Sequence, residues 1–396
     1  MKADLCIRCR GGRHLCGLSY CPLLVRNLAT PFRRPPPKEL YGSSPPSVFV
    51  GRVGYPRVRL YPSAPPEIGD TSQYENPRLW LELPLEHFLA MRLSLYRGAV
   101  ELRVEDAAKP HRVLQEVQLL ALSHSPVEVD MTFRRAPRGA YFSEYAPPMG
   151  PSAPAERLRI VGNPSLPRAV ERAYGDLDLK ASEAVVELYR AGLDVSYISR
   201  ALSVGALGGR RRLVPTRWAI TAVDKIVSDY LLEKVKSYPE VDGYYLYARR
   251  TVGNLFVAIL APSKWAYEWG EAFEPNTVWN PGPEVEVEAD YELYGGRRDY
   301  PEIGGCYYAA RLAVAEHLYA LRRQAAAILW REVYTGFTTP LGVWWVRENV
   351  RAMFKEPPAR FDTLEDALQA VSYLLKLPLE KWLSASRLVQ VFRSRL

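Results

Sequence analysis

Four of the five cysteines of this chain lie within its first 21 residues, spaced as Cys6-x-x-Cys9 and Cys16-x-x-x-x-Cys21. Two close pairs of thiolates supply the four ligands that zinc takes in tetrahedral structural sites. Glycines between the pairs allow the tight turns that wrap a backbone round a metal. Because four thiolates leave no open coordination position, we predict one structural Zn²⁺ per chain and no metal catalysis at this site. The alternative is a loop of free thiols.

His14 lies between the two cysteine pairs. It is an alternative ligand to one cysteine, but we expect it outside the ligand set or facing a phosphate. A segment of about thirty residues cannot bury enough apolar surface to fold alone, so the metal would supply its stability.

Positive charge is concentrated near the N-terminus. The net charge is +8, and the first 60 residues hold eleven Lys and Arg against two acids, a surplus of nine. A basic segment favours a polyanionic partner such as DNA, because phosphate neutralisation releases counterions. A solvated basic face is the other interpretation. With no apolar run of about 18 residues and no signal peptide, we expect a cytoplasmic protein without membrane contact.

Composition divides the chain into three predicted regions. Residues 1–38 form the zinc module and a Pro/Arg linker, residues 39–356 form the body, and residues 357–396 form a C-terminal helix with a basic tail. Three consecutive prolines, Pro35 to Pro37, favour an extended linker. The many prolines between Pro147 and Pro167 indicate a long loop.

The body shows short strands that pair locally and helices in separate runs. Residues 243–248 and 254–261 are predicted to form an antiparallel hairpin, and the apolar run 325–333 a buried strand. Residues 180–236 and 307–323 have helical periodicity. The prediction is an α+β fold with antiparallel sheets, preceded by a small zinc-binding module with four cysteine ligands.

An arginine-rich segment precedes one predicted helix. Glycines 205, 208 and 209 lead into Arg210, Arg211 and Arg212, and Pro215 and Thr216 precede a helix expected to begin at Arg217. Thr216 would cap this helix and leave its N-terminal N–H groups free for phosphate. Arginine binds phosphate in a bidentate manner, and Trp218 is suited to stacking on a base. A solvated basic turn is the alternative.

A second candidate phosphate contact is the segment Phe49-Val-Gly-Arg-Val-Gly-Tyr-Pro56. Its two glycines suggest a strand exit where Arg52 would meet a phosphate, although a simple turn has the same pattern. Catalytic motifs are not evident. Cys306 precedes a helix, where a thiol pKa is lowered, but no base accompanies it, so we expect a small buried cysteine.

The tail carries an incomplete sliding-clamp motif. Clamp ligands follow the pattern Q-x-x-L-x-x-F-F, in which Leu388 and Phe392 match, while Ala385 replaces the glutamine and Val391 an aromatic residue. We predict weak clamp binding through Leu388, Val391 and Phe392. An amphipathic helix packed on the body is the alternative.

Six segments, taken together and in order, resemble the archaeal Nre (novel repair) family of DNA-repair proteins. They are Leu15-Cys-Gly-Leu-Ser-Tyr-Cys-Pro-Leu-Leu24, Ser43-Ser-Pro-Pro-Ser-Val-Phe-Val-Gly-Arg-Val-Gly-Tyr-Pro56, Gly150-Pro-Ser-Ala-Pro154, Arg211-Arg-Leu-Val-Pro-Thr-Arg-Trp-Ala-Ile-Thr-Ala-Val-Asp224, Gly304-Gly-Cys-Tyr-Tyr-Ala-Ala-Arg311 and Thr339-Pro-Leu-Gly-Val-Trp-Trp-Val-Arg-Glu348. The resemblance implies an N-terminal zinc module, partnership with the sliding clamp (PCNA), and nucleotide-excision-type or crosslink repair. It names no reaction.

Two classes of function follow. The first is a DNA-repair factor that binds DNA or a nucleotide through basic surfaces and docks on the sliding clamp. The alternative is a repair-associated enzyme of unknown reaction whose body holds a nucleotide-derived ligand. A deep pocket lined by residues 210–218 and the Gly51 loop would favour the enzyme, and a flat basic surface would favour the DNA-binding factor.

Overall fold

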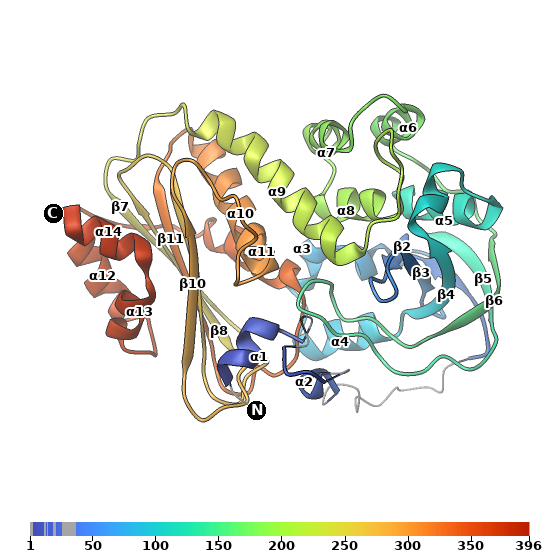
Figure 1. Ribbon diagram of the computed structural model, residues 1–396, viewed down its shortest axis with the longest axis horizontal. Helices are drawn as coiled ribbons and strands as arrows, with labels where there is room; N and C mark the ends of the chain where they lie inside the picture. Colours follow the sequence, from blue (N-terminus) through green and yellow to red (C-terminus); the bar gives the residue numbers. More distant parts are fainter. Residues whose placement is uncertain (1–2, 12, 14, 19–20, 26–36, 396) are drawn as a thin grey trace. The chain divides into compact units, whose positions relative to one another are not determined.

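The structure is a computed structural model that describes residues 3–395 except 12, 14, 19–20 and 26–36. His14 and most of the predicted Pro/Arg linker therefore lie outside the described residues. The chain forms two compact units (Figure 1). Unit 1 comprises Met1–Arg26, Ser143–Tyr145 and Ser228–Leu396, and unit 2 comprises Asn27–Phe142 and Ala146–Val227. The cysteine-rich segment and the C-terminal tail thus both belong to unit 1.

Unit 2 is built on a six-stranded mixed sheet. In spatial order its strands are β1 (Glu39–Ser44), β5 (Val127–Phe133), β6 (Ser152–Ile160), β4 (Tyr96–Arg103), β3 (Arg57–Ala64) and β2 (Ser47–Val50). All neighbours are antiparallel except β4 and β6, which pair in parallel. The chain between these two strands passes through a helix and β5, and such a crossover allows the parallel direction.

Helices cover this sheet, and short 3₁₀ turns connect some of its elements. They are η2 (Ser72–Glu75), α3 (Pro77–Trp80), α4 (Leu85–Leu93), η3 (Val104–Ala108), α5 (Arg112–Leu122), α6 (Arg168–Gly175), α7 (Ala181–Arg190), α8 (Val195–Ser203) and the first part of α9 (Thr216–Val235). Helices α5 and α8 contact each other, and both contact β2. Each presents a buried apolar stripe to these partners, such as Leu114, Val117 and Ala121 on α5.

Unit 1 is built on a second six-stranded mixed sheet. Its spatial order is β10 (Glu286–Glu292), β9 (Ala266–Phe273), β11 (Ala326–Val333), β8 (Asn254–Ala261), β7 (Tyr244–Thr251) and β12 (Ala359–Phe361). Only β9 and β11 are parallel, and helix α10 (Gly305–Leu321) lies in the chain between them. The predicted α+β class is confirmed. The prediction of antiparallel sheets was wrong for one strand pair in each sheet, because β4 and β6 and also β9 and β11 are parallel.

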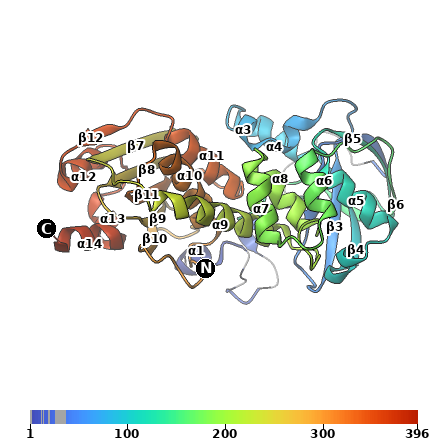
Figure 2. The ribbon, with the colours of Figure 1, turned by 90° about the horizontal axis from the view of Figure 1, so that it is seen from above.

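Helices cover both faces of the unit 1 sheet. Figures 1 and 2 show α10 and α11 (Val343–Met353) on one face, and α12 (Leu364–Ser372), α13 (Leu379–Ala385) and α14 (Arg387–Arg395) on the other. Every residue of β8, β9 and β11 is buried. This explains why β8 and the first five residues of β11 read as apolar runs and not as alternating patterns, whereas β9 also carries the buried Glu268 and Glu271. The short helices α1 (Ala3–Cys9) and α2 (Pro22–Val25) also belong to unit 1.

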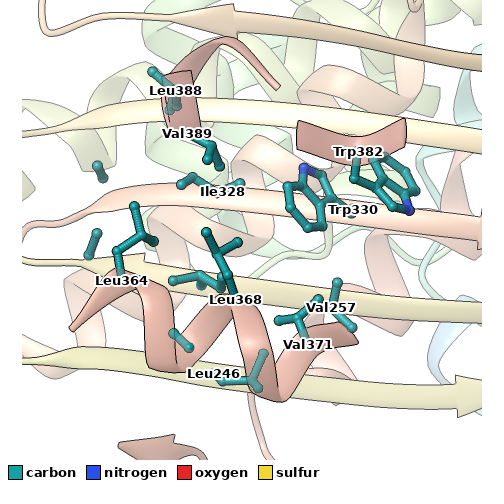
Figure 3. Close-up of a cluster of buried hydrophobic side chains, with 14 of the residues drawn as sticks. Leu246, Val257, Ile328, Trp330, Leu364, Leu368, Val371, Trp382, Leu388 and Val389 are labelled. Atoms are coloured by element: carbon teal, nitrogen blue, oxygen red, sulfur yellow. The ribbon is translucent and has the colours of Figure 1, made fainter. Parts of the chain in front are cut away.

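The core between this sheet and helices α12 to α14 is closed by aromatic and aliphatic side chains (Figure 3). Trp330 of β11 stacks on Trp382 of α13, with ring centroids 5.0 Å apart. Leu364 and Leu368 of α12 and Leu388 of α14 are each 1 % exposed. The tail is therefore an integral part of the core of unit 1.

Local patterns located several elements correctly. The predicted hairpin is β7 and β8, joined at Val252 and Gly253, and the apolar run 325–333 is strand β11. Strand β6 was missed because prolines made its region look like a loop. Pro154 lies where β6 changes partner, pairing with Ala99 of β4 before the later residues pair with β5. No helix in the described part of the chain is long and apolar enough to cross a membrane.

Candidate functional site

The Gly51 loop and the start of α9 meet in unit 2. The backbone N–H of Val50 donates to Oγ1 of Thr216 over 2.8 Å, although the two residues are 166 positions apart. Oγ1 of Thr216 also lies 3.0 Å from Oγ of Ser203. Two motifs that the sequence analysis treated separately thus form one place on the molecule.

The start of α9 differs by one residue from the expectation. The helix begins at Thr216, and the carbonyl of Pro215 accepts hydrogen bonds from N–H of Trp218 (2.8 Å) and Ala219 (3.0 Å). Pro215 therefore occupies the capping position predicted for Thr216. The Thr216 hydroxyl instead fixes the end of β2, because it accepts from Val50.

Two aromatic rings are exposed together at this junction. Tyr55 and Trp218 pack edge to face, with centroids 5.2 Å apart and an interplanar angle of 64°. Tyr55 is 48 % exposed, Trp218 is 44 % exposed, and the neighbouring Val53 is 86 % exposed. Large apolar groups so exposed and so close together are typical of a binding surface.

Backbone hydrogen bonds join a third segment to this junction. N–H of Val104 donates to the carbonyl of Pro56 (3.0 Å), and N–H of Leu213 donates to the carbonyl of Val104 (2.9 Å). The arginine next to each of these residues is exposed: Arg57, Arg103 and Arg212. We call Val53, Tyr55, Arg57, Arg103, Arg212 and Trp218 the aromatic–arginine surface.

Two of these arginines face each other. Arg57 of β3 is the direct cross-strand partner of Arg103 of β4. Like charges at opposed positions destabilise a sheet unless an anion or an acid lies between them. Glu105 lies 3.7 Å from Arg103 at the edge of this pair. Tyr55, Arg57 and Arg103 were not predicted as site residues. The register of β3 and β4 brings the two arginines together, and the ring contact with Trp218 places Tyr55 beside α9.

The arginines that the sequence analysis proposed are placed differently from one another. Arg210 is exposed, while Arg52 and Arg217 are half-buried and have contacts within the protein. Arg211 donates to the carbonyls of Gly208 and Tyr174 and lies 4.7 Å from the centroid of the Tyr174 ring. Burial lowers the pKa of Arg211. Its guanidinium is therefore engaged in local structure.

The four clustered cysteines lie in one neighbourhood of unit 1. Cys6 and Cys9 occupy one turn of α1 and are 8 % and 7 % exposed. Burial raises the pKa of Cys6, and Cys21, Cys9 and Cys16 each raise it further because their charges are close. All five cysteines of the chain are free thiols. Such a donor set suits zinc, yet no group of three or more His, Cys, Asp or Glu among the described residues is arranged to hold a metal ion.

Arg10 anchors the cysteine segment in unit 1. It is 2 % exposed, and its guanidinium lies 2.7 Å from Glu271 and 3.8 Å from Glu144 and forms an ion pair with Glu288. Burial alone would lower the pKa of Arg10, but these three carboxylates raise it well above its ordinary value. The segment is thus bound to unit 1 by a buried charge.

Cys306 lies beside this ion-pair cluster at the start of α10. Its Sγ is 3.7 Å from Nη1 of Arg10. Burial raises the pKa of the Cys306 thiol well above its usual range, and Glu271 adds to the effect. A protonated, buried thiol is a poor nucleophile. The placement agrees with the expected small buried cysteine.

The C-terminal tail is a packed helix in this structure. Leu388 and Val389 of α14 are each 1 % exposed. The buried carboxylate of Glu268 accepts from Oγ of Ser386 (2.5 Å) and from N–H of Leu388 (2.8 Å). Phe392 is half-buried against the same core, and Val391 is also half-buried. Of the two interpretations of this segment, the amphipathic helix packed on the body describes this geometry.

Comparison with known proteins gives full-length relationships. Residues 15–280 match the family described as Archaeal Nre, N-terminal, and residues 292–396 match Archaeal Nre, C-terminal. A protein named DNA repair protein NreB from Archaeoglobus fulgidus is 46 % identical over 394 residues, which cover 98 % of each chain. DNA repair protein NreA of the same organism is 37 % identical over 94 % of each chain. NreA of Haloferax volcanii is 38 % identical over 86 % of this chain and 84 % of its own. No solved structure matches the chain.

Proposed function

The chain belongs to the archaeal Nre family, and from this membership we propose a DNA-repair factor that binds DNA with unpaired bases through the aromatic–arginine surface. Relatives named as DNA repair proteins support the repair role. DNA binding is proposed from one observation: the rings of Tyr55 and Trp218 are exposed together. They lie beside exposed arginines of three segments that backbone hydrogen bonds join.

Exposed aromatic rings suit unpaired bases in particular. Stacking of a base on a side-chain ring contributes roughly 1–3 kcal/mol and tolerates any base, because every base has a π-face. In a paired duplex the base faces are covered by their neighbours. A damaged or opened site would therefore offer Tyr55 and Trp218 a surface that intact duplex does not.

The arginines supply the phosphate contacts of this proposal. Arg57 and Arg103 face each other across β3 and β4, so a backbone phosphate between them would relieve their repulsion. Arg212 lies beside the hydrogen bond that joins Leu213 to Val104. Contacts of this type give sequence-independent affinity that weakens steeply as salt is raised.

We also propose that Cys6, Cys9, Cys16 and Cys21 hold one Zn²⁺ with a structural role. Four thiolates would close its coordination shell, so the ion would stabilise the segment that carries the four cysteines and supply no reactive ligand position. Arg10, next to Cys9, would transmit that order to the ion-pair cluster of unit 1.

Docking on the sliding clamp is a conditional part of the proposal. Leu388, the residue that matches the leucine of clamp ligands, is 1 % exposed in the packed helix α14. Clamp binding through Leu388, Val391 and Phe392 therefore requires α14 to leave unit 1. A free peptide of residues 380–396 should bind the clamp more tightly than the intact chain does, and equal affinities would contradict this condition.

The DNA-binding proposal is tested by comparing three labelled DNAs: a single strand, a duplex with an unpaired bubble, and an intact duplex. We expect the intact duplex to bind most weakly. Trp218→Ala should weaken binding to the single strand and the bubble by about 5- to 150-fold, the equivalent of one to three kcal/mol of stacking. Binding to the intact duplex should change little.

A matched control separates stacking from a general loss of aromatic surface. Tyr373 is 78 % exposed and belongs to unit 1, whereas the residues of the proposed surface belong to unit 2. Tyr373→Ala should leave all three affinities unchanged. Equal effects of Trp218→Ala on all three DNAs, or no effect on any, would rule out the stacking surface.

A further inference from the structure

Unit 2 contains an excess of buried positive charge. Arg92 is 1 % exposed and Arg97 is 5 % exposed, and Arg200 is half-buried nearby. Glu75 is the carboxylate that Arg92 and Arg200 share: it lies 2.8 Å from Nη1 of Arg92 and is close enough to Arg200 to act on its charge. Three guanidinium groups and one carboxylate leave a net charge of two positive units (3 − 1).

The other acid near Arg200 does not offset this excess. Asp194 acts on Arg200 more weakly than Glu75 does. It also lies 3.5 Å from the guanidinium of Arg78 and accepts the N–H of Ser196 as the N-cap of α8. The positive charge of Arg78 balances the negative charge of Asp194. The net charge of two positive units around Arg92, Arg97 and Arg200 is therefore unchanged.

Arg97 is a buried arginine that no carboxylate neutralises. Among the residues that the structure describes, none offers a carboxylate within ion-pair distance of its guanidinium. Its Nε donates to the carbonyl of Gly150 over 2.8 Å. Burial lowers the pKa of Arg97 to about 10, and the positive charge of Arg92 acts in the same direction. Buried charges in proteins are normally paired, so this arginine is unusual.

Two tyrosine rings flank the same guanidinium. It lies 5.1 Å from the centroid of the Tyr61 ring and 5.7 Å from that of Tyr141. Phe49 packs against both rings, at 5.9 Å and 4.8 Å. Both tyrosines are only half-buried. Ring faces hold a cation through cation–π attraction, and they also offer a stacking partner to a heterocyclic base.

The two arginines are held in place by one segment. Nε of Arg92 donates to the carbonyl of Pro148 (3.0 Å), two residues before the carbonyl that holds Arg97. Gly150 is required there, since a Cβ would lie 2.4 Å from the carbonyl oxygens of Leu93 and Leu95. The backbone thus fixes both charges before any ligand binds, which reduces the entropy cost of binding.

We propose that Arg97, Arg92, Tyr61 and Tyr141 form a binding site for a phosphate monoester carried by a nucleoside. A monoester dianion matches the two uncompensated positive charges, and the tyrosine rings would receive the base. Because Arg92 and Arg97 are so deeply buried, a phosphate within a continuous DNA strand cannot reach them. The ligand is therefore a free nucleotide or the phosphorylated terminus of a strand.

This site is separate from the aromatic–arginine surface and does not rest on it, since the two have no residue in common. The test is calorimetry on the full-length chain with 5′-nucleoside monophosphates, the unphosphorylated nucleosides and inorganic phosphate. We expect the monophosphates to bind, phosphate to bind more weakly, and the nucleosides to bind weakest. Absence of binding by both the monophosphates and phosphate would overturn the proposal.

Two further ligands distinguish the sources of the phosphate. A short single strand with a 5′-phosphate is compared with the same strand without it. Tighter binding of the phosphorylated strand, abolished by excess mononucleotide, assigns a strand terminus to the site. Equal binding of the two strands, together with binding of free mononucleotide, identifies a free nucleotide as the ligand of the site. Each of these outcomes supports the site, and loss of DNA binding in Trp218→Ala bears on neither.

Arg97→Met tests the residue itself, with Arg59→Met on the neighbouring strand β3 as the exposed control. Arg97→Met should lower nucleotide affinity by about 100-fold or more, as losing a buried charged partner commonly does. The melting temperature without ligand should stay constant or rise, because an unpaired buried charge is removed. A large fall in melting temperature with unchanged nucleotide affinity would make Arg97 purely structural. If Arg97→Met does not fold, Arg97→Lys should bind the monophosphates more weakly than the unmodified protein, and unchanged affinity in that variant would overturn the assignment.

Discussion

Replacing Arg10 by methionine tests whether the cysteine segment is part of unit 1. Arg10 lies 2.7 Å from Glu271 and forms an ion pair with Glu288, and it is 2 % exposed. Glu271 would keep a second partner, because Nη1 of Arg331 lies 2.7 Å away. Glu288 would lose its ion-pair partner in the buried cluster.

Removing one partner of a buried ion pair commonly costs about 3–5 kcal/mol, because a charge is left uncompensated. The retained pair of Glu271 and Arg331 places the expected loss for Arg10→Met at about 3 kcal/mol of unfolding free energy. Burial raises the pKa of Glu288 to about 7, so this carboxyl is largely neutral at pH 6 and largely ionised at pH 8. The destabilisation should therefore be larger at pH 8 than at pH 6.

The assay is urea unfolding followed by tryptophan fluorescence. Seven of the nine tryptophans belong to unit 1, so the signal reports mainly on that unit. Arg8→Met is the matched control, because Arg8 is exposed on the same helix α1. It should change the unfolding free energy by less than about 0.5 kcal/mol. If Arg10→Met is as stable as Arg8→Met, Arg10 does not anchor the segment and the reasoning fails.

Three further predictions concern stability and metal content. Burial lowers the pKa of His317 to about 4 from 6.5, so the stability that its neutral form contributes is present above pH 6.5 and lost as pH falls towards 4. By linkage this contribution is about 3 kcal/mol. In urea unfolding at pH 7 and pH 4, the unfolding free energy of His317→Gln should therefore fall by about 3 kcal/mol less than that of the unchanged protein. Leu388→Ala should lower the unfolding free energy by about 2–5 kcal/mol, because Leu388 is buried in the core of unit 1, and a loss below about 0.5 kcal/mol would show that α14 is not packed in solution. Elemental analysis should find about one zinc per chain and close to none in Cys6→Ser combined with Cys21→Ser, whereas equal zinc in both proteins would exclude these ligands.

Local sequence signals predicted the parts of the fold that local energetics determine. The turn at Val252 and Gly253 and the apolar run of β11 specify their structures within about ten residues. The parallel pair of β9 and β11 has no local signal, because its direction depends on the crossover through α10. The same limit applies to β6, whose pairing with both β4 and β5 outweighs its proline.

The candidate sites divide in the same way. Trp218 and the arginine-rich segment were recognised from composition, but their neighbour Tyr55 is defined by the bond between Val50 and Thr216. The unpaired charge of Arg97 is visible only once burial is known, since nothing in its sequence neighbourhood distinguishes it from a surface arginine. Leu388 shows the converse: its spacing fits a docking peptide, and its burial reveals a core position.

The salt dependence of single-strand binding tests the central claim most directly. Each arginine that neutralises a phosphate contributes about 0.7 to the slope of log K against log salt concentration for single strands. A variant with Arg57→Ala, Arg103→Ala and Arg212→Ala should therefore reduce the magnitude of this slope by about 2 relative to the unchanged protein. An unchanged slope in a variant that melts at the same temperature would contradict DNA binding through the aromatic–arginine surface.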